Sequence, residues 1–270
     1  MPLPSHSLQP EGNTWLDYCS TMLIPPPKLE RYWGLHPDVI LHIGAHLAEE
    51  LDAYERMGWG RTRVIWVEAM PESAAILREQ FKGQARHELI EALAWNASGE
   101  TVTFSIANNG ESSSALAMKD HLVQYPHIVV ESRLEMTTTA LADILDFEGL
   151  GRIDLVNLDI QGAELRALQG LEPQLWRVDA IVSEVNKREL YAGGALLPEM
   201  DAWLSARGFA RVDWEMLPAG WGDALWLRDS TRPSGARVRR FARRLPETPS
   251  RLDRFARRMG RRVFPARTTA

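Results

Sequence analysis

Short apolar runs alternate with segments of helical periodicity from residue 38 to about residue 228. A run that is apolar at nearly every position is typical of a strand buried in a parallel sheet, and apolar residues three or four apart indicate a covering helix. The expected strands lie at residues 39–43, 64–67, 87–94, 101–106, 153–158, 178–185, 209–217 and 224–227. This alternation predicts an α/β fold whose mostly parallel sheet ends in an antiparallel pair of strands.

The helices between these strands are predicted from periodicity and from residues that begin or end helices. Leu47, Leu51 and Tyr54 share one face of the first helix, and Gly58 is its expected cap. Pro71 is expected to open the second helix, because the first position of a helix does not need the N–H that proline lacks. Further helices are expected near residues 141–145, 165–171 and 198–208.

Residues 108–136 are polar and less regular than the rest of the chain. A segment of this length is too long for a simple connector, so it predicts a loop that closes over a ligand. Its three consecutive serines, Ser112, Ser113 and Ser114, are expected to offer hydrogen bonds to the hydroxyl groups of a bound substrate.

Charge divides the chain unevenly. Residues 231–270 carry 13 basic and 2 acidic side chains, a balance of +11, whereas residues 1–230 have a balance of −16. We therefore expect three parts, namely an irregular, proline-rich N-terminal arm at 1–37, a folded α/β domain at 38–230 and a basic tail at 231–270 that is partly helical or disordered.

The basic tail contains the sequence Arg-Phe-Ala-Arg-Arg twice, at residues 240–244 and 254–258. Both copies have the spacing of basic amphipathic helices, which suit an acidic partner or an anionic membrane surface. A plainer interpretation is that the tail neutralises the acidic body. A nucleic acid partner is not expected, because the acidic body would repel phosphate.

Composition narrows the class of protein. The single cysteine, Cys19, excludes an intrachain disulfide and a cysteine zinc cluster, and no apolar run has the length of a membrane helix. The start of the chain lacks the pattern of a signal peptide, so a cytoplasmic location is expected.

Ligands of open parallel sheets bind beyond the carboxyl ends of the strands, so the residues that follow each strand are candidate site residues. Gly44 follows the first strand and permits a tight turn, and a helix start behind it would offer free N–H groups to an anion. Glu68 ends the second strand, where an acid can bind both ribose hydroxyls. The plainer alternatives are an ordinary strand–helix turn and a solvated carboxylate.

Polar side chains also follow the two strands at residues 153–158 and 178–185. Asp159 can cap the next helix, orient a cofactor ammonium group, accept a substrate proton or bind a cation. Glu184 and Asn186 point to the same side of their strand, and with Asp159 they suit a bound polyol or, less favoured, Mg²⁺ or Ca²⁺. Glu164 is expected to face solvent or a basic partner, with a role in the site as the alternative.

Two histidines flank the turn after the first strand. His46 lies in the loop over the proposed cofactor and is, with Asp159, a candidate general base, with local packing as the alternative. His42 lies on the strand itself and is either a hydrogen-bonded core residue or part of the cofactor site.

Three stretches in this order resemble the FkbM family of S-adenosylmethionine-dependent methyltransferases, over about residues 39–228. They are His42-Ile43-Gly44-Ala45-His46, Val67-Glu68-Ala69-Met70-Pro71 and Asn157-Leu158-Asp159-Ile160-Gln161-Gly162-Ala163-Glu164. The chain departs from the fuller pattern at Ala48, where glycine is frequent, and at Gln161, where glutamate is frequent. The resemblance implies a class I methyltransferase Rossmann-like fold, with a seven-stranded, mostly parallel sheet and one antiparallel strand.

The resemblance also implies a function and a set of roles. It implies S-adenosylmethionine as methyl donor and a hydroxyl of a sugar, glycan or natural product as acceptor. The implied cofactor contacts are Gly44 and Ala45 with His42 beside them for the methionine part, Glu68 for the ribose, Leu93 and Ala94 for the adenine, and Asp159 for the transferring methyl.

Two other functions use the same residues. A nicotinamide-dependent Rossmann oxidoreductase would share the glycine turn and the ribose acid, although two of its usual glycines are missing here. A non-catalytic methyltransferase-like module would use the domain as a scaffold and the basic tail as its binding arm. The sequence does not identify the acceptor.

Overall fold

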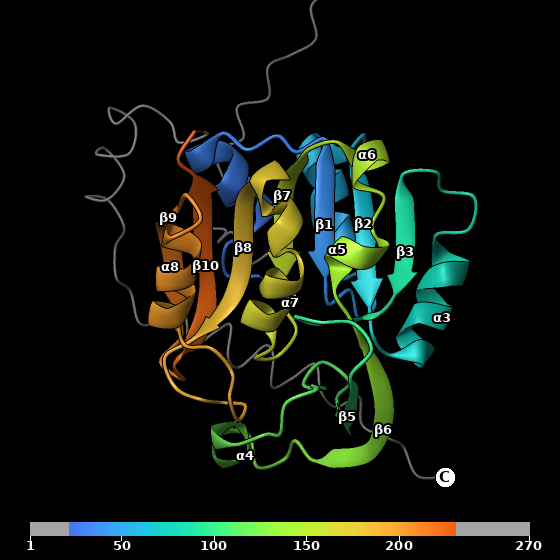
Figure 1. Cartoon of the computed structure of the whole chain (residues 1–270), viewed down its shortest axis with the longest axis vertical. Coiled ribbons are helices and arrows are strands. Elements are labelled where there is room, and N and C mark those ends of the chain that lie inside the picture. The colour runs from blue at the N-terminus through green and yellow to red at the C-terminus, as the bar shows by residue number, and fades with distance from the viewer. Residues whose placement is uncertain (1–21, 231–270) are drawn as a thin grey trace, which may run out of the picture.

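Seven strands form the central sheet of the computed structural model, which describes residues 22–230 (Figure 1). They are β1 (Val39–Ile43), β2 (Arg63–Glu68), β3 (His87–Glu91), β7 (Ile153–Leu158), β8 (Val178–Asn186), β9 (Phe209–Met216) and β10 (Trp221–Arg228). Their spatial order is β3-β2-β1-β7-β8-β10-β9. Because β10 pairs antiparallel with both β8 and β9 and the other pairs are parallel, one strand runs against the other six. The predicted sheet is confirmed.

A smaller sheet lies beyond the carboxyl ends of the central strands (Figure 1). It contains β4 (Leu93–Ala94), β5 (Thr101–Ala107) and β6 (Val130–Thr139), in the order β4-β6-β5. β6 pairs antiparallel with β5 along most of its length and parallel with the short β4. This second sheet was not predicted, and it places residues 101–139 next to the edge where ligands bind in this kind of fold.

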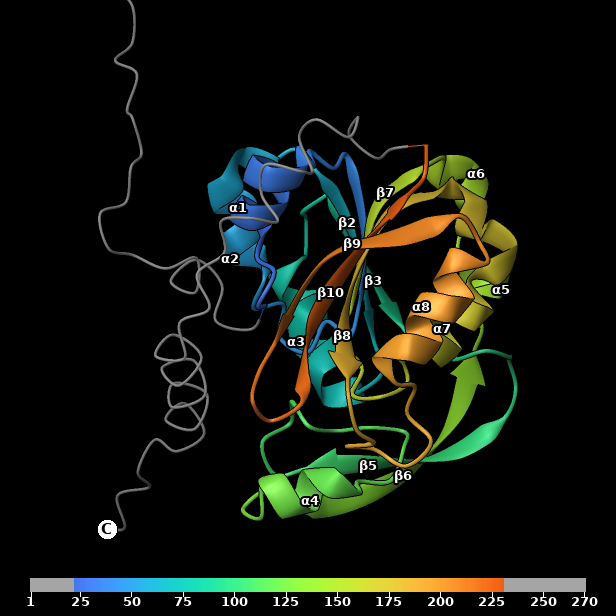
Figure 2. The same ribbon diagram turned by 90° about the vertical axis from the view of Figure 1, so that its left-hand side faces the viewer.

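Helices cover both faces of the central sheet, and Figure 2 shows α1 to α3 on one face and α5 to α8 on the other. They are α1 (Pro26–Lys28), the π-helix η2 (Leu29–Trp33), α2 (Leu51–Tyr54), the π-helix η3 (Glu55–Trp59), α3 (Pro71–Gln80), α4 (Asp120–Gln124), α5 (Leu141–Ile144), α6 (Phe147–Leu150), α7 (Glu164–Gly170), the 3-10 helix η4 (Glu172–Arg177) and α8 (Leu197–Ser205). Pro71 stands at the start of α3, as predicted.

Alternation along β1 divides the core between the two faces. Leu41 and Ile43 pack in the cluster beneath α5 to α8, whereas Ile40 packs in the cluster beneath α1 to α3. The central strand β7 is almost wholly buried, which explains why residues 153–158 are apolar at nearly every position. Both faces of the sheet are therefore closed, and only the edge at the strand ends remains for a ligand.

Three local predictions were wrong. The first helix does not include Leu47, because His46 and Ala48 adopt left-handed backbone angles (φ 44° and 57°) and delay its start to Leu51. Gly58 lies inside the π-helix η3 instead of capping the helix. The strand predicted at 87–94 is two strands of different sheets.

The predicted irregular loop at 108–136 also needs correction. Its last quarter, residues 130–136, belongs to β6, and α4 interrupts the remainder. The strand β6 was not predicted, because most of its side chains are exposed or half-buried and its sequence is therefore polar.

The segment that precedes β1 is anchored on the far edge of the central sheet. The backbone N–H groups of Leu23 and Ile24 donate to Oδ2 of Asp223 on β10, at 2.6 and 3.0 Å. The buried Lys28 ammonium group lies 2.9 Å from Asp213 and 2.7 Å from Glu215, both on β9. Within the arm predicted at 1–37, the chain forms the short helices α1 and η2. Residues 1–21 of the arm and the basic tail with its repeat lie outside the described residues.

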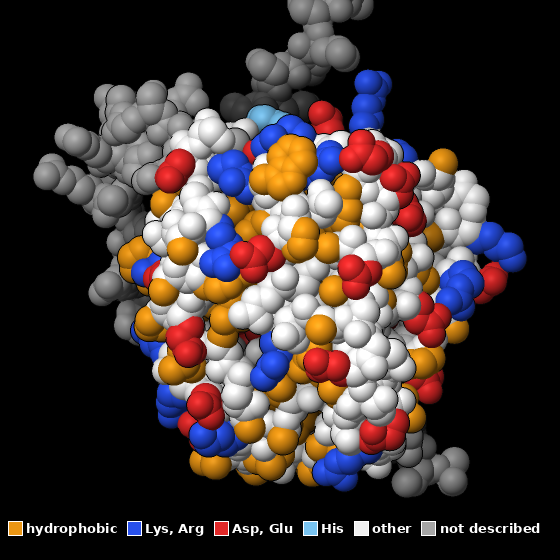
Figure 3. All heavy atoms as spheres, in the orientation of Figure 1, with side chains coloured by type: hydrophobic (Ala, Val, Ile, Leu, Met, Phe, Trp, Pro, Cys, Tyr) orange, Lys and Arg blue, Asp and Glu red, His pale blue; other side chains and the backbone are white. Residues whose placement is uncertain are grey.

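Acidic and basic side chains are interspersed over the face seen in Figure 3, with no large patch of one sign. Hydrophobic side chains gather at its lower edge, where α4 exposes Leu122 and Val123. Within residues 22–230, no helix combines the length and apolar character needed to cross a bilayer.

Candidate functional site

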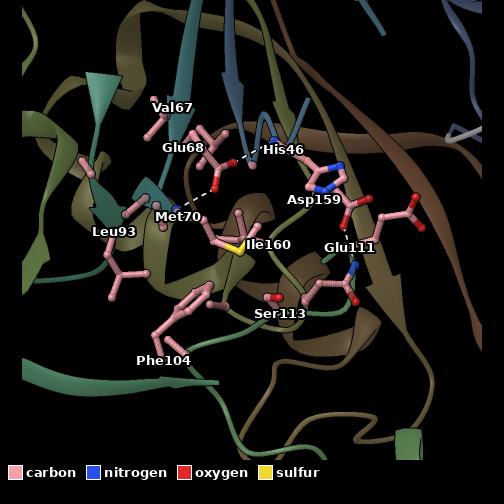
Figure 4. A pocket seen from close by; sticks show the side chains of 18 of the residues that line it. His46, Val67, Glu68, Met70, Leu93, Phe104, Glu111, Ser113, Asp159 and Ile160 are labelled. Atoms are coloured by element: carbon pink, nitrogen blue, oxygen red, sulfur yellow. Dashed lines mark hydrogen bonds between the residues drawn. The ribbon is translucent and has the colours of Figure 1, made fainter. Parts of the chain in front are cut away.

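A pocket of about 580 Å³, partly open to solvent, lies at the carboxyl ends of β1, β2 and β7 (Figure 4). Its walls combine residues from the central sheet with residues of the smaller sheet and its loop. The lining residues are Ile43, Gly44, His46, Val67, Glu68, Ala69, Met70, Ala92, Leu93, Ala94, Phe104, Gly110, Glu111, Ser113, Ala115, Asp159, Ile160, Gln161 and Ala163. This is the position expected of a ligand site in an open α/β sheet.

Gly44 makes the turn that joins β1 to the pocket. Its φ of +93° is unfavourable for residues with a side chain, and a Cβ there would lie 1.9 Å from the carbonyl oxygen of Asp159. Only glycine therefore lets the chain after β1 approach the chain after β7 this closely. The N–H groups of Gly44 and Ala45 both donate to the Val67 carbonyl, at 2.9 and 3.0 Å.

Glu68 stands at the end of β2 with both carboxylate oxygens engaged. Oε2 accepts the backbone N–H of His46 and Oε1 accepts that of Met70, each at 2.7 Å (Figure 4). Burial raises the pKa of Glu68, and the two amide bonds counteract that rise. Each oxygen retains a further acceptor site, so the carboxylate can also receive hydrogen bonds from a ligand in the pocket.

An apolar wall lies beside Glu68. Met70, Leu93 and Phe104 form one buried cluster, and Ala94 adds a small buried surface next to Leu93. Figure 4 shows Leu93 and Phe104 on one side of the pocket and His46, Glu111 and Asp159 on the other. The pocket thus has an apolar half and a polar half.

His46 belongs to the polar half. Its Nδ1 lies 2.7 Å from Oε1 of Glu49. Burial alone would lower the pKa of His46, but the hydrogen bond and charge of Glu49, with further help from Glu111 and Glu68, raise it. A histidine with a raised pKa is positively charged over a wider pH range, which reduces its value as a general base. Potential ligand atoms of His46, Glu49 and Glu111 lie within 4.8 Å of one another.

Asp159 follows β7 and presents an exposed side chain to the pocket. Its Oδ1 accepts a hydrogen bond from Nε2 of Gln161 at 2.7 Å. Its recessed position among protein groups raises the pKa of the Asp159 carboxyl, and the charge of Glu49 adds to the rise. It is therefore the carboxyl group best placed to exchange a proton with a molecule in the polar half.

Glu184 and Asn186 lie behind Asp159 and do not line the pocket. Both side chains are buried, and Nε2 of Gln161 also donates to Oε2 of Glu184, at 3.1 Å. Asn186 donates through Nδ2 to Oε1 of Glu184 at 3.2 Å. The predicted direct contact of these two residues with a substrate is therefore replaced by contact with Gln161 and with each other.

The family model for the methyltransferase FkbM domain matches residues 38–210, well over half of the chain. The chain belongs to the FkbM methyltransferase family. It is 27% identical over 164 residues to the 2-O-methyltransferase NoeI of Sinorhizobium fredii. The aligned stretch covers 58% of this chain and 67% of that protein. Membership of the family, whose methyl donor is S-adenosylmethionine, favours methyl transfer over nicotinamide-dependent oxidation.

A solved structure of methyltransferase FkbM from Methylobacillus flagellatus has the same fold, with a TM-score of 0.51 and 14% sequence identity. The likeness covers 78% of this chain but only 47% of the other, so this chain spans about half the length of that protein. At this identity the likeness concerns the fold alone, the class I methyltransferase arrangement described above.

Among the predicted residues of this FkbM protein, the pocket brings together Gly44, His46, Glu68, Leu93, Ala94, Ser113 and Asp159. His42 points to the opposite face, where its Nδ1 lies 3.1 Å from the Tyr54 hydroxyl, and burial lowers its pKa to about 4. Alternation along β1 explains this, because Ile43 and not His42 faces the pocket. Ala45 is fully buried and its N–H is already bonded, so it is not a lining residue either.

The three serines shape the loop more than they face a ligand. Ser112 Oγ accepts a bond from Asn109, and Ser114 Oγ donates to the Gln161 carbonyl at 2.8 Å. Only Ser113 lines the pocket, and its Oγ accepts the Ala107 N–H. The expected free helix N-terminus behind Gly44 is absent from the described part of the chain, because α2 begins seven residues later at Leu51.

Glu164 is buried instead of facing solvent. Its Oε1 accepts the N–H groups of Ile160 and Gly162, and burial raises its pKa to about 7. Sequence reasoning did not assign Phe104, Glu111 or Gln161 to the site. The only available signal was the departure from the family pattern at Gln161. The strand that carries Phe104 was predicted but its position beside the pocket was not, and Glu111 lies in a loop without periodicity.

Proposed function

We propose that this FkbM protein transfers a methyl group from S-adenosylmethionine to a hydroxyl oxygen of a sugar, glycan or natural product. The observation that carries the proposal is the juxtaposition of two acids, Glu68 and Asp159, on one pocket next to the Gly44 turn. The printed name of the relative NoeI, a 2-O-methyltransferase, supports oxygen as the acceptor atom.

The residues present fit the proposed donor. The cluster of Met70, Leu93 and Phe104 suits the flat, apolar faces of an adenine ring. Glu68, held by two backbone amides, suits the paired hydroxyls of a ribose. Gly44 lets backbone approach the remaining part of the molecule without a side chain between them.

When bound, S-adenosylmethionine supplies a methyl group on a positively charged sulfur, and that methyl–sulfur bond breaks as the new oxygen–methyl bond forms. The protein's task is to align the acceptor hydroxyl and to remove its proton. Asp159 is the proposed base, because its carboxyl is exposed to the pocket. His46 is the weaker candidate, since Glu49 favours its protonated form.

A pair of variants separates donor binding from chemistry. The purified protein is incubated with isotope-labelled S-adenosylmethionine and a panel of glycans and hydroxylated metabolites, and methylated products are detected by mass spectrometry. Asp159→Asn is expected to lower turnover by about 10²- to 10⁴-fold, the usual effect of a general base. Its donor affinity, measured by calorimetry, is expected to stay within about twofold of the wild type.

Asp143→Asn is the matched control, because Asp143 is exposed and remote from the pocket lining. Equal loss of donor binding and turnover in Asp159→Asn would reduce Asp159 to a structural role. Failure of the wild-type protein to bind any methyl donor would contradict the proposed function itself.

A further inference from the structure

The side-chain amide of Gln161 lies between two carboxyl groups, those of Asp159 and Glu184. Its backbone is left-handed (φ 55°), and Gly162 follows with φ 98°. Its Oε1 lies 2.7 Å from the Tyr191 hydroxyl, whose other acceptor, the Ser112 carbonyl, is farther away at 3.2 Å, so Gln161 receives the shorter bond. Its Nε2 donates to Asp159 at 2.7 Å and to Glu184 at 3.1 Å, so each polar group of this side chain has a partner.

The two carboxyl groups that share the Gln161 amide lie close to each other. Oδ1 of Asp159 and Oε2 of Glu184 lie 2.7 and 3.1 Å from the same Gln161 nitrogen, so two ionised carboxylates here would repel each other, and one proton on the pair removes that repulsion. Glu184 is the more buried of the two, at 8% exposure, and its other partner is the amide of Asn186. No lysine or arginine is among the residues that line the pocket in the described part of the chain.

We propose that Asp159 and Glu184 form a carboxyl pair that shares one proton, and that Gln161, clamped by Tyr191, is the positioning residue that holds the pair. The proton resides on the buried Glu184, and the pocket-facing Asp159 carries the negative charge. The use of this carboxyl pair in catalysis rests on the proposed methyl transfer, whereas the existence of the pair does not.

The electrostatic surroundings agree with a single charge on the pair. Burial and the nearby charges of Asp159 and Glu164 raise the pKa of Glu184 well above its ordinary value. The titratable groups that face the pair are His46 and Glu49 from the loop after β1, Glu164 at the start of α7, Tyr191 from the segment after β8 and Asp223 on β10. Among them only His46 can carry a positive charge.

In the proposed reaction, the proton of the acceptor hydroxyl moves to Asp159 as the oxygen–methyl bond forms. The pair then holds two protons, and one leaves to solvent through the pocket, to which Asp159 is exposed. Because Gln161 donates to Asp159, it stabilises the ionised form that begins each cycle.

A cation bridging the two carboxyl groups is the competing arrangement. Oδ1 of the buried Asn186 has no hydrogen-bond partner, and an oxygen in this position could serve as a ligand. The Gln161 amide nitrogen, however, already lies between the two carboxyl groups, where such a cation would bind. The experiment therefore includes a metal titration.

The test is a carboxyl ¹³C NMR titration of the unliganded full-length protein, with resonances assigned from Asp159→Asn and Glu184→Gln. The wild type is expected to titrate in two coupled steps, an upper one on Glu184 and a lower one on Asp159. Asp159→Asn should lower the proton affinity of Glu184 at least about tenfold, because it removes the facing charge. Glu184→Gln should abolish the upper step.

Gln161→Ala is expected to raise the proton affinity of Asp159 several-fold, and Tyr191→Phe should act in the same direction more weakly, since it frees the amide without removing it. Gln84→Ala is the matched control, because the Gln84 side chain is exposed and donates to the Gln80 carbonyl, outside the pocket lining. In a methyl transfer assay, Gln161→Ala should move the acid limb of the pH–rate profile in the same direction as the NMR titration.

Independent titration of the two groups near their ordinary values in the wild type would overturn the proposal. So would unchanged titrations in both Gln161→Ala and Tyr191→Phe, or displacement of the shared proton by micromolar Mn²⁺ added alone. If the titrations are as expected but no donor binds, the pair stands and the proposed function fails. If donor binding and turnover are found with uncoupled carboxyl groups, the function stands and the pair fails.

Discussion

Asp223 provides a stability prediction whose magnitude follows from the structure. Its carboxylate is 7% exposed and its Oδ2 accepts two backbone N–H groups of the N-terminal segment. Burial raises its pKa from 3.8 to about 7, despite the bond from Ile24 and with a further rise from the charge of Asp159. The folded state therefore keeps a proton that the unfolded chain has already lost between about pH 4 and pH 7.

The sign of the effect follows directly. A group whose pKa is raised on folding contributes its full stability below about pH 4, and that contribution is lost as the pH rises through about 7. Each pKa unit corresponds to about 1.4 kcal/mol, so between pH 5 and pH 8 the contribution of Asp223 falls by about 3 kcal/mol. Asp223→Asn removes the titrating group while keeping an oxygen that can accept both N–H bonds.

The assay is urea unfolding of the wild type and of Asp223→Asn at pH 5 and pH 8. The free energy of unfolding of the variant, relative to that of the wild type, is expected to be about 3 kcal/mol higher at pH 8 than at pH 5. Asp52→Asn, at an exposed position, serves as the control and should leave this difference near zero. Parallel pH dependence of the wild type and Asp223→Asn would refute the reasoning.

Three further predictions concern the pocket. Gly44→Ala should lower the free energy of unfolding by about 3 kcal/mol, from left-handed strain plus the clash with the Asp159 carbonyl. Gly99→Ala, with φ +89° and open space around the added Cβ, should lose only the strain, about 1–2 kcal/mol, so equal losses in thermal unfolding would contradict the close approach. Glu68→Ala should weaken S-adenosylmethionine binding at least about tenfold by calorimetry, whereas Glu91→Ala, at the end of the neighbouring β3, should not, and unchanged affinity in both would remove the ribose role. Methyl transfer should continue in excess EDTA, and its complete loss with recovery on added Mg²⁺ would restore the metal interpretation of Asp159.

The central sheet could be predicted from the sequence because its strands are buried on both faces. Continuous apolar runs such as residues 153–158 have few other interpretations in a soluble chain. The smaller sheet could not be predicted, because β6 is largely exposed or half-buried and its alternation resembles that of a polar loop. Exposure of the β6 side chains on both faces of the small sheet removes the hydrophobic pattern on which the prediction depends.

Site residues that directly follow the parallel strands could be predicted from the sequence. Residues whose roles depend on the direction of their side chains could not. Gly44, Glu68 and Asp159 come directly after parallel strands, so the topology alone brings them together. Of the two interpretations of His42, the structure shows the hydrogen-bonded core residue and not the cofactor contact, because one step along β1 turns a side chain to the opposite face. Gln161 was missed because its role depends on a hydroxyl 30 residues away, on Tyr191, which sequence spacing does not bring near it.

Two sheets contribute residues to the pocket, the central sheet and the smaller sheet with its loop. The central sheet contributes Gly44, Glu68 and Asp159, whereas the smaller sheet and the loop after β5 contribute Phe104 and Glu111. Exchanging residues 101–139 between relatives would therefore alter one wall, including Phe104, while the opposite wall kept its sequence. Chimaeras cut at these two positions would report whether that wall sets acceptor preference, donor affinity or both.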